Sequence, residues 1–286
     1  LIEVGGTRIL LDPWLKGDLV FGGAGWLFRG TRPHPTEIPD AIDVILLSQG
    51  LEDHAHPETL KQLDNSIPVV GSPNAASVVE EFGFAHITAL AHGETHRIND
   101  RIEIHAIPGS PIGPTLVENA YILKDLETGR SLYYEPHGFH SESIQTYAPI
   151  DVVVTPMINL ELPLLGPIIK GRDSALKAAE WLKPQVMLPT AGTGEVQYEG
   201  LLLSLLQAKG AVDDIRAGLR SWAGLAHESY PQLALLASNM EIAAATENKP
   251  EVNIYVSLQL AMIQALLEQN NLLPKPAASA APEANE

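Results

Sequence analysis

A short stretch of the chain gathers side chains that can bind a metal ion or transfer protons. Asp53, His54 and His56 lie a few residues beyond the apolar run 44–47. An apolar run that ends abruptly in short polar groups is typical of a buried strand that delivers functional side chains to the edge of a sheet. Imidazole nitrogen and carboxylate oxygen bind zinc at about 2 Å and also serve as general acids and bases. The stretch therefore predicts a metal or acid–base site.

A second group of such side chains follows the apolar run 131–134. Glu135 and His137 are two residues apart, so both can point to one side of an extended backbone. A carboxylate and an imidazole at the end of a buried strand can supply half of a metal site. The alternative is a solvated turn in which Pro136 stops the strand. The residues alone leave both interpretations open.

Residues 43–57 resemble the metal-binding signature of the metallo-β-lactamase superfamily, in which a strand is followed by His-x-His-x-Asp-His. When the two are aligned on the strand and the Asp-His pair, Asp53 and His54 match the signature. The first two histidines of the signature fall on Gln49 and Leu51. The resemblance implies that Asp53 and His54 contribute to the family's second metal position. Gln49 offers an amide oxygen, a weak ligand, and Leu51 offers none.

Other loops also depart from the family pattern. Ser110 follows Pro108-Gly109, and Thr190 follows Pro189, at places where similar family members have a histidine ligand. Glu135 stands near the place of an aspartate that bridges two metals in the family. The resemblance therefore implies a mononuclear site with one divalent metal, zinc first and iron or manganese as alternatives, or no metal in an inactive protein. Its expected ligands are Asp53, His54, Glu135 and His137.

Structural roles are the alternative for each of these residues. Asp53 could cap a helix that begins near Pro57, with His54 packed over it. His56 is expected to be an exposed residue before that proline, and Ser110 a polar turn residue. The remaining histidines lack a second ligand at a diagnostic spacing and are expected on the surface; they are His34, His92, His96, His140 and His227.

The order of the expected elements predicts an α/β fold. Mixed strands and helices of this kind fit two packed sheets with helices outside, and the resemblance implies a four-layer αββα sandwich of two mixed sheets. The expected domain spans 1–220, followed by a helical extension over 221–272 and a disordered Ala/Pro/Glu-rich tail over 273–286. The expected strands are 95–97, 102–107, 119–124 and 131–134, and the expected helices are 74–82, 173–183, 199–208 and 253–270.

Composition narrows the possible partners. The formal net charge is −17, from 35 acidic and 18 basic residues, and such a charge disfavours nucleic-acid binding, which depends on Lys and Arg contacts with phosphates. The absence of cysteine excludes disulfides and thiolate ligands. No apolar run reaches the roughly twenty residues that span a bilayer. We therefore expect a cytoplasmic protein with a small-molecule substrate; the chain begins inside a strand-like run, so we expect a truncated N-terminus that could have carried a targeting segment.

Three functions fit these patterns. The first is a metal-dependent hydrolase of a small ester, lactone or phosphodiester, in which Asp53 orients water and His137 or Glu135 transfers protons. The second is a catalytically inactive relative that serves as a binding or scaffolding module, because fold alone does not imply chemistry. The third is a metal-free binder that uses the glycine-rich loop 17–30, with Trp26 and Phe28 as stacking surfaces.

Overall fold

The computed structural model describes residues 1–34, 36–113, 115–163, 166–190, 196–210 and 215. The expected helical extension over 221–272, the helix 253–270 within it and the tail over 273–286 lie outside the described residues. Over the described part the protein is a mixed α/β structure with several sheets and few helices. None of the helices in that part is long and apolar enough to span a membrane.

A five-stranded sheet carries the first half of the site. Its strands pair in the order β1-β2-β5-β6-β7, with β1 antiparallel to β2 and the other neighbours parallel. These strands are β1 (Ile2–Val4), β2 (Thr7–Leu11), β5 (Val44–Leu47), β6 (Val69–Gly71) and β7 (Ile87–Ala89). All four residues of β5 are buried, as expected for a strand that is covered on both faces.

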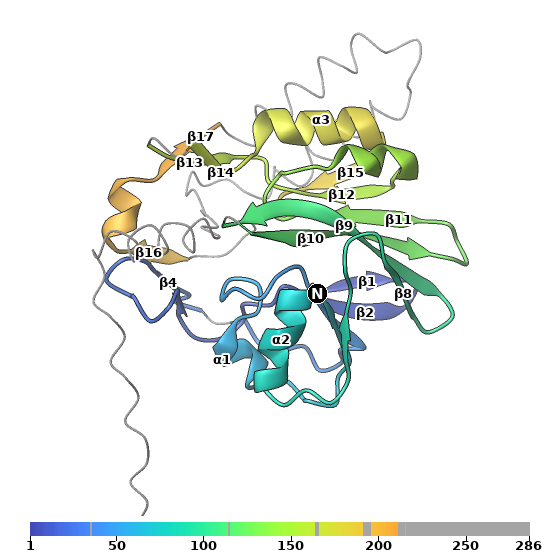
Figure 1. Ribbon diagram of the computed structural model, residues 1–286, viewed down its shortest axis with the longest axis horizontal. Coiled ribbons are helices and arrows are strands. Elements are labelled where there is room, and N and C mark those ends of the chain that lie inside the picture. Colours follow the sequence, from blue (N-terminus) through green and yellow to red (C-terminus); the bar gives the residue numbers. More distant parts are fainter. Residues whose placement is uncertain (35, 114, 164–165, 191–195, 211–214, 216–286) are drawn as a thin grey trace, which may run out of the picture.

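A six-stranded mixed sheet carries the other half. It has the order β15-β12-β11-β10-β9-β8, with parallel pairing among β11, β12 and β15 and antiparallel pairing elsewhere. Its strands are β8 (Thr95–Ile98), β9 (Ile102–Ile112), β10 (Leu116–Asp125), β11 (Ser131–Tyr134), β12 (Val152–Val154) and β15 (Val186–Leu188). Figure 1 shows the two sheets one above the other, with α3 on the upper side and α1 and α2 on the lower side.

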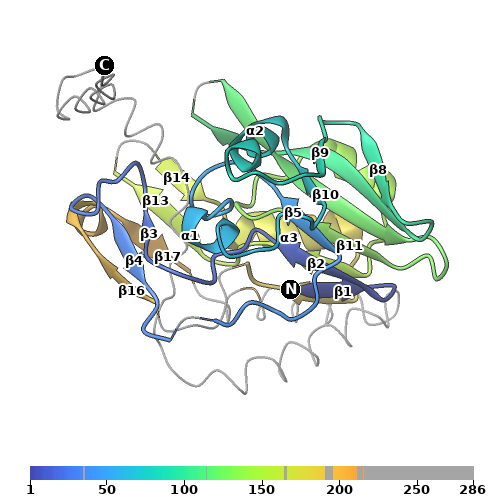
Figure 2. The same cartoon turned by 90° about the horizontal axis from the view of Figure 1, so that it is seen from below.

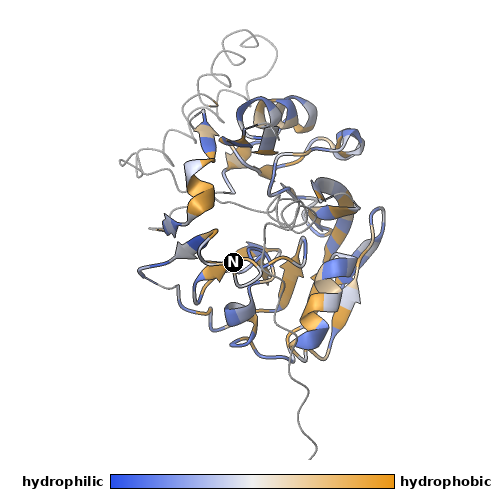
Figure 3. Cartoon of the chain, turned by 60° about the vertical axis from the view of Figure 1, so that its left-hand side comes forward, coloured by the Kyte–Doolittle hydropathy of each residue, from blue (hydrophilic) through white to orange (hydrophobic). Residues whose placement is uncertain are grey.

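Apolar side chains fill the space between the sheets. One buried cluster joins residues of both, such as Ile9 and Leu46 of the first sheet with Ile104 and Tyr121 of the second. Figure 3 shows the hydrophobic residues concentrated in the strands, with hydrophilic residues in the connecting loops. Burial of this apolar surface is the main stabilising term, and it fixes the strand ends that carry the polar groups of the site.

Helices cover the outer faces of these sheets. Helices α1 (Pro57–Leu60) and α2 (Pro73–Glu81) pack with the first sheet through a cluster that includes Leu60, Val79 and Ile45. Figure 2 shows both from below. Helix α3 (Arg172–Leu182) packs with the second sheet through a cluster that includes Leu182 and Tyr133. In α2 a proline begins the helix and Ser72 caps it, a favoured start because the first turn leaves backbone N–H groups without helical partners.

Two small sheets lie at one end of the molecule, formed by β14-β13-β17 and by β16-β4-β3. The predicted helix over 199–208 is wrong: a 3₁₀ turn, η2 (Leu201–Ser204), is followed by strand β17 (Gln207–Lys209). The other elements are β3 (Leu19–Val20), β4 (Arg29–Thr31), β13 (Asn159–Leu162), β14 (Gly166–Ile169), β16 (Gln197–Glu199) and the 3₁₀ turn η1 (Glu142–Tyr147). Pairing of β17 with β13 outweighs a local pattern that fits a helix.

Candidate metal centre

The site begins where β2 and β5 end side by side. These two parallel strands pair Leu11 with Leu46, so the residues that follow them reach the same edge of the sheet. Asp12 accepts hydrogen bonds from the backbone N–H of Ser48 (2.7 Å) and from its hydroxyl (2.6 Å). Tyr134, at the end of β11 in the other sheet, donates its hydroxyl to the same carboxylate at 2.6 Å. Asp12 therefore connects the ends of β2, β5 and β11 through hydrogen bonds.

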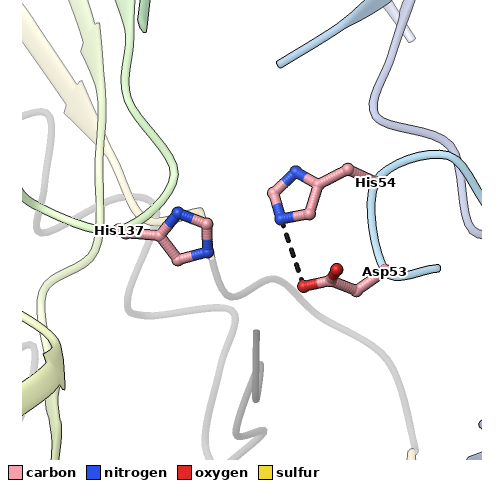
Figure 4. A group of neighbouring side chains, drawn as sticks. All are labelled: Asp53, His54 and His137. Atoms are coloured by element: carbon pink, nitrogen blue, oxygen red, sulfur yellow. Dashed lines mark ion pairs between the residues drawn. The ribbon is translucent and has the colours of Figure 1, made fainter. Parts of the chain in front are cut away.

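Asp12 also orients His54. The His54 Nδ1 lies 2.7 Å from Asp12 Oδ2, and because a carboxylate only accepts, Nδ1 carries the donated proton. This directs Nε2 toward Asp53, whose Oδ2 is 3.1 Å away (Figure 4). Burial alone would lower the pKa of His54, but the charges of Asp53 and Asp12 raise it well above its ordinary value. The surroundings of this ring therefore favour its protonated, positively charged form.

Asp53 does not cap a helix, contrary to the structural alternative. The N-cap of α1 is His56, whose ring accepts a hydrogen bond from the backbone N–H of Thr59 at 3.3 Å. His56 is buried, so the expectation that it is exposed is wrong. The Asp53 side chain is also buried, and neither of its oxygens has a hydrogen-bond partner among the described residues. Its Oδ2 forms an ion pair with the His54 Nε2 at 3.1 Å.

Glu135 and His137 lie in a buried loop after β11, so the solvated-turn interpretation is wrong. Glu135 Oε2 accepts hydrogen bonds from the backbone N–H groups of His137 (3.1 Å) and Gly138. Gly138 has φ +78°, a conformation that glycine adopts readily, and this turn places the His137 ring 5.1 Å from the His54 ring, centroid to centroid. Figure 4 shows one ring nitrogen of His137 facing the Asp53–His54 pair.

Glu118 is a further member that sequence reasoning missed. The pairing of β9 with β10 is irregular between Val117 and Asn119, so Glu118 lies in a β-bulge. A bulge breaks the alternation of side chains and can turn an extra one inward, and Glu118 and Asn119 are both fully buried. Glu118 Oε1 contacts the Nδ1 of His137 at 2.5 Å and accepts from the backbone N–H of Ser110 at 3.1 Å, and Oε2 accepts from Gln49 Nε2 at 3.1 Å.

Burial shifts the protonation equilibria of this cluster. The pKa of Glu118 rises to about 8 because burial disfavours its charge. The pKa of Glu135 also rises to about 8, through burial and the nearby Glu118 charge. Burial and the charge on His54 lower the pKa of His137 to about 4. All three shifts favour uncharged groups in the absence of a further cation.

The donor set fits a divalent ion. There are two groups of three residues whose ligand atoms lie within 4.8 Å of one another inside each group. The first group is Asp53, His54 and His137, and the second is Glu118, Glu135 and His137. The first group includes polar atoms without hydrogen-bond partners among the described residues, on Asp53 and on His54 Nε2. Buried charges are normally paired, hydrogen-bonded or bound to a metal, so the first group has the chemistry of a metal site. The structure does not place Glu135 in that first group.

The four residues that the resemblance predicts to stand in place of histidine ligands have structural contacts of their own. Gln49 is fully buried and donates to Glu118, while half-buried Leu51 packs against an apolar cluster. Ser110 is buried inside β9, which continues to Ile112, so the predictions that this strand ends at 107 and that Ser110 is a turn residue are wrong. Thr190 is half-buried, and its backbone N–H donates to Thr155 O at 3.3 Å.

Asp12 was the other missed residue. Asp12-Pro13 reads as the end of a strand, but the signal that it belongs to the site was the parallel pairing of its strand with 44–47, which places Asp12 beside Ser48. Glu118 gave no comparable signal, because the bulge that turns it inward is not visible in the sequence. The expectation of a surface position is also wrong for His140, whose half-buried ring contacts the hydroxyl of Tyr133 at 3.0 Å.

Comparison with protein families decides the family. Residues 1–191 match the model described as the beta-lactamase superfamily domain. The chain belongs to this superfamily. It therefore contains a metallo-β-lactamase-fold domain of the metal-dependent hydrolase type, as the resemblance of residues 43–57 predicted. No curated protein sequence matches the chain.

Two solved structures support the fold, and a third is similar at a lower score. An isothiocyanate hydrolase from Delia radicum gut bacteria is 16% identical with a TM-score of 0.53, over 68% of this chain and 81% of the hydrolase. A possible metal-dependent hydrolase from Veillonella parvula DSM 2008 is 14% identical with a TM-score of 0.50, over 65% of this chain and 80% of that one. The CmlA β-hydroxylase E377D mutant is 20% identical, with a TM-score of 0.49, and the match covers 65% of this chain and only 42% of the hydroxylase.

Proposed function

We propose that the protein is a metal-dependent hydrolase with one divalent ion held by Asp53, His54 and His137. The observation that carries the proposal is the buried Asp53 carboxylate, which has no hydrogen-bond partner among the described residues and lies within 4.8 Å of ligand nitrogens of both histidines. A buried carboxylate without hydrogen bonds costs several kcal/mol unless a cation compensates it; in the metal-free protein the protonated His54 ring does so, and a bound ion would take the place of that proton. Zinc fits this nitrogen and oxygen donor set, and iron or manganese would also be accepted.

Each residue has a distinct role in this proposal. A bound ion supplies Lewis acidity and lowers the pKa of water toward 7. Asp53 presents two unpartnered oxygens, one to bind the ion and one to orient water. Glu135, next to His137, keeps its Oε1 without a hydrogen-bond partner among the described residues. We assign proton transfer to this buried carboxyl group because of its place beside His137 and the availability of this oxygen. The sequence-based assignments of Glu135 as a ligand and of His137 as a proton-transfer group stay predictions.

The substrate that we propose is a small ester, lactone or phosphodiester. A cavity of about 340 Å³ is lined by uncharged residues that include Leu51, Val78, Ile112 and Leu116; Leu51 precedes Asp53 in the chain, and the proposed ligands themselves do not line the cavity. Such a lining favours an apolar group on the substrate, so esters and lactones precede phosphodiesters in a screen. The net charge of −17 argues against a polyanionic substrate such as a nucleic acid.

We also propose that the two large sheets and their covering helices form the four-layer αββα sandwich of the family. The support comes from the buried apolar clusters. The first sheet packs against α1 and α2 on one face and against the second sheet on its other face. Helix α3 packs on the far face of the second sheet. This arrangement places the ends of β5 and β11 at one edge, where Asp53 and His137 meet.

Metal content and hydrolysis together test the proposal. We would purify the protein without chelator and measure metals by elemental mass spectrometry, beside His54→Ala and the matched surface variant His34→Ala; His34 is exposed. We expect about one equivalent of metal in the parent and in His34→Ala, and none in His54→Ala. Chelator should abolish hydrolysis of a panel of aryl esters, lactones and phosphodiesters, and added zinc should restore it.

The opposite results would redirect the search. Absence of metal from the parent would overturn the proposal and favour the inactive binding or scaffolding module, a reading that the replaced ligands at Gln49, Leu51, Ser110 and Thr190 support. Metal that is bound without hydrolysis of any substrate class would overturn the enzymatic part alone.

A further inference from the structure

The bulge residue Glu118 occupies the space between two of the positions where this chain has lost family ligands. Its Oε2 accepts from Gln49 Nε2 at 3.1 Å, and its Oε1 accepts from the backbone N–H of Ser110 at 3.1 Å. The carboxyl group is fully buried. Both oxygens are therefore engaged by residues that stand where the family resemblance implies histidine ligands, Gln49 in the signature and Ser110 in a separate loop.

Glu118 differs in this respect from Asp53. The oxygens of Asp53 have no hydrogen-bond partner among the described residues, whereas Glu118 has a donor at each oxygen. A group whose acceptor sites are filled by protein donors has less capacity left for an ion. The two carboxylates therefore differ in their capacity to bind an ion. The Asp53 oxygens still have acceptor capacity, whereas the Glu118 oxygens accept hydrogen bonds from protein donors.

Glu118 also fixes the third ligand. Its Oε1 lies 2.5 Å from the Nδ1 of His137, which leaves Nε2, on the other side of the ring, for the Asp53–His54 side. With an ion bound at the site to keep Glu118 charged, a carboxylate on the distal nitrogen fixes the tautomer and orientation of a ligand histidine and raises its basicity. Asp12 does the same for His54, with 2.7 Å between Oδ2 and Nδ1. Each ligand histidine therefore has its own carboxylate.

Backbone geometry supports this placement. The bulge between Val117 and Asn119 turns Glu118 inward, and Gly109 on the neighbouring strand leaves room for it, since a Cβ at 109 would lie 3.0 Å from Glu118 Cγ. His92 adds a contact of 3.0 Å from its Nε2 to the backbone oxygen of Glu118. Three parts of the chain hold the carboxyl group in the same place.

We propose that Glu118 is a positioning residue whose own oxygens are engaged by protein donors, so that the protein binds a single ion and Glu118 orients His137 toward it. The inference rests on the proposed function, because it assumes the ion at Asp53, His54 and His137. The inference adds two points to that function: the site holds no more than one ion, and Glu118, which is not a ligand, orients one of the ligands. The competing possibility is that Glu118, Glu135 and His137, the second group of ligand atoms, bind an ion themselves.

Two substitutions of Glu118 separate these possibilities. Glu118→Gln keeps an oxygen that can accept from His137 and Ser110, and the Gln49 amide can turn to present its Oε1, which has no partner among the described residues, to the new amide. It removes the anionic oxygen that a metal ligand needs. Glu118→Ala removes the support of His137 altogether. Glu103→Gln is the matched control, because Glu103 contacts His105 Nε2 at 2.8 Å away from the site.

The experiment is calorimetric titration of zinc into chelator-treated full-length protein, with the affinity measured by competition against a chromophoric chelator. We expect one equivalent for the parent, Glu118→Gln and Glu103→Gln, with affinities within about tenfold of each other. Glu118→Ala should bind about 10–100-fold more weakly, as for loss of a group that orients a ligand. Nitrogen-15 spectra of the zinc-loaded parent should show His137 with a proton on Nδ1, and this signal should be lost in Glu118→Ala.

Several results would overturn the inference. Two equivalents in the parent, or a loss in Glu118→Gln as large as that in His137→Ala, would identify Glu118 as a ligand and leave the proposed function intact. Unchanged affinity and an unchanged His137 signal in Glu118→Ala would exclude the positioning role. Absence of zinc binding by the parent would overturn both proposals, whereas one equivalent without any hydrolysis would overturn the proposed function alone.

Discussion

Two buried carboxylates in the first half of the site have opposite surroundings. Asp12 accepts hydrogen bonds from Ser48 and Tyr134 and contacts the His54 ring. Asp53 has no hydrogen-bond partner among the described residues. Its charged contact is with the His54 ring, 3.1 Å away, and a buried carboxylate with so few polar partners gains little for folding, so we attribute the position of Asp53 to binding.

Replacing Asp53 should therefore separate binding from stability. In the presence of chelator we expect Asp53→Asn to change the melting temperature little, because loss of the charged contact with His54 offsets the removal of a buried charge that has no hydrogen bonds. In the presence of zinc the parent should gain stability by mass action, and the variant should not. Differential scanning fluorimetry with and without zinc measures both effects.

Asp40→Asn, at an exposed carboxylate, is the control and should behave as the parent does. Substantial destabilisation of the metal-free protein by Asp53→Asn would show that the charged contact with His54 is a structural interaction, and would weaken the case for a metal at this position.

At the scale of elements, the loop after β11 has little tolerance for change. Gly138 has φ +78°, and its N–H donates to Glu135. A Cβ at this position would lie 1.7 Å from the backbone oxygen of Lys170. The loop that carries His137 is thus packed directly against the backbone that precedes α3.

Gly138→Ala should be severely destabilising. The left-handed conformation alone costs a residue with a Cβ about 1–2 kcal/mol, and Gly129→Ala reports that cost separately, because Gly129 has φ +74° and no atom within 4 Å of its added Cβ. We expect Gly138→Ala to lose at least about 2 kcal/mol more than Gly129→Ala in urea unfolding, through the backbone clash. Equal losses in the two variants would show that the backbone near Lys170 moves aside.

An ion pair at the β9–β10 hairpin base gives the fold a pH dependence. Arg101 donates two hydrogen bonds of 3.0 Å to the carboxylate of Asp125, and Thr128 donates another at 2.8 Å. These donors, Arg101 first, hold the pKa of Asp125 well below its usual range. A carboxylate with a lowered pKa in the folded state stabilises the fold above its unfolded pKa of about 3.9, and this stabilisation is lost as the pH falls further.

Asp125→Asn should therefore lower the urea midpoint most above about pH 5. The difference in midpoint between the variant and the parent should narrow below about pH 4. Unfolding curves at pH 7, 5 and 3, in chelator, measure the gap. Asp40→Asn should show none. A gap that stays constant across this range would mean that Asp125 acts through shape and neutral hydrogen bonds.

Elements with strong local patterns were predictable from the sequence. Strand 131–134 has the predicted bounds, the strand predicted over 43–47 begins one residue later as β5, and the helix predicted over 173–183 is shifted by one residue in α3. The predicted helix over 199–208 failed because β-pairing with β13 outweighs local propensity. The strand predicted to end at 107 continues to 112, because Pro108 and Pro111 pair with β10 on either side of the bulge.

Predictability of the site followed the same rule. Asp53 and His54 follow β5, a strand that the sequence predicts from its apolar run, and the structure places them next to His137. Glu118 was not predictable, because its inward direction depends on a bulge formed between two strands. His56 failed for a related reason: its burial depends on packing with Trp14, whose ring centroid is 6.0 Å away, and on a contact with Asp18 O at 3.1 Å, and both come from a distant loop.

At the scale of the whole molecule the excess of negative charge is the main electrostatic feature. Acidic residues outnumber basic ones 35 to 18, which gives a formal charge of −17. Repulsion among like charges destabilises a compact state, and salt screens it over about 10 Å at 0.1 M. A buried divalent ion and general screening both reduce this repulsion, so they must be distinguished in any stability measurement.

Salt should stabilise the metal-free protein. In chelator, we expect the melting temperature to rise by about 2–4 °C between 20 and 300 mM sodium chloride, the shift that about 1 kcal/mol produces in a chain of this size. Without chelator, one equivalent of zinc at constant ionic strength should add a further rise, because a few micromolar ions screen nothing and act only by binding. This further rise should vanish in His54→Ala and the salt-dependent rise should remain. A zinc effect that persists in His54→Ala, or that magnesium at equal ionic strength reproduces, would assign the stabilisation to diffuse attraction of cations by the acidic surface.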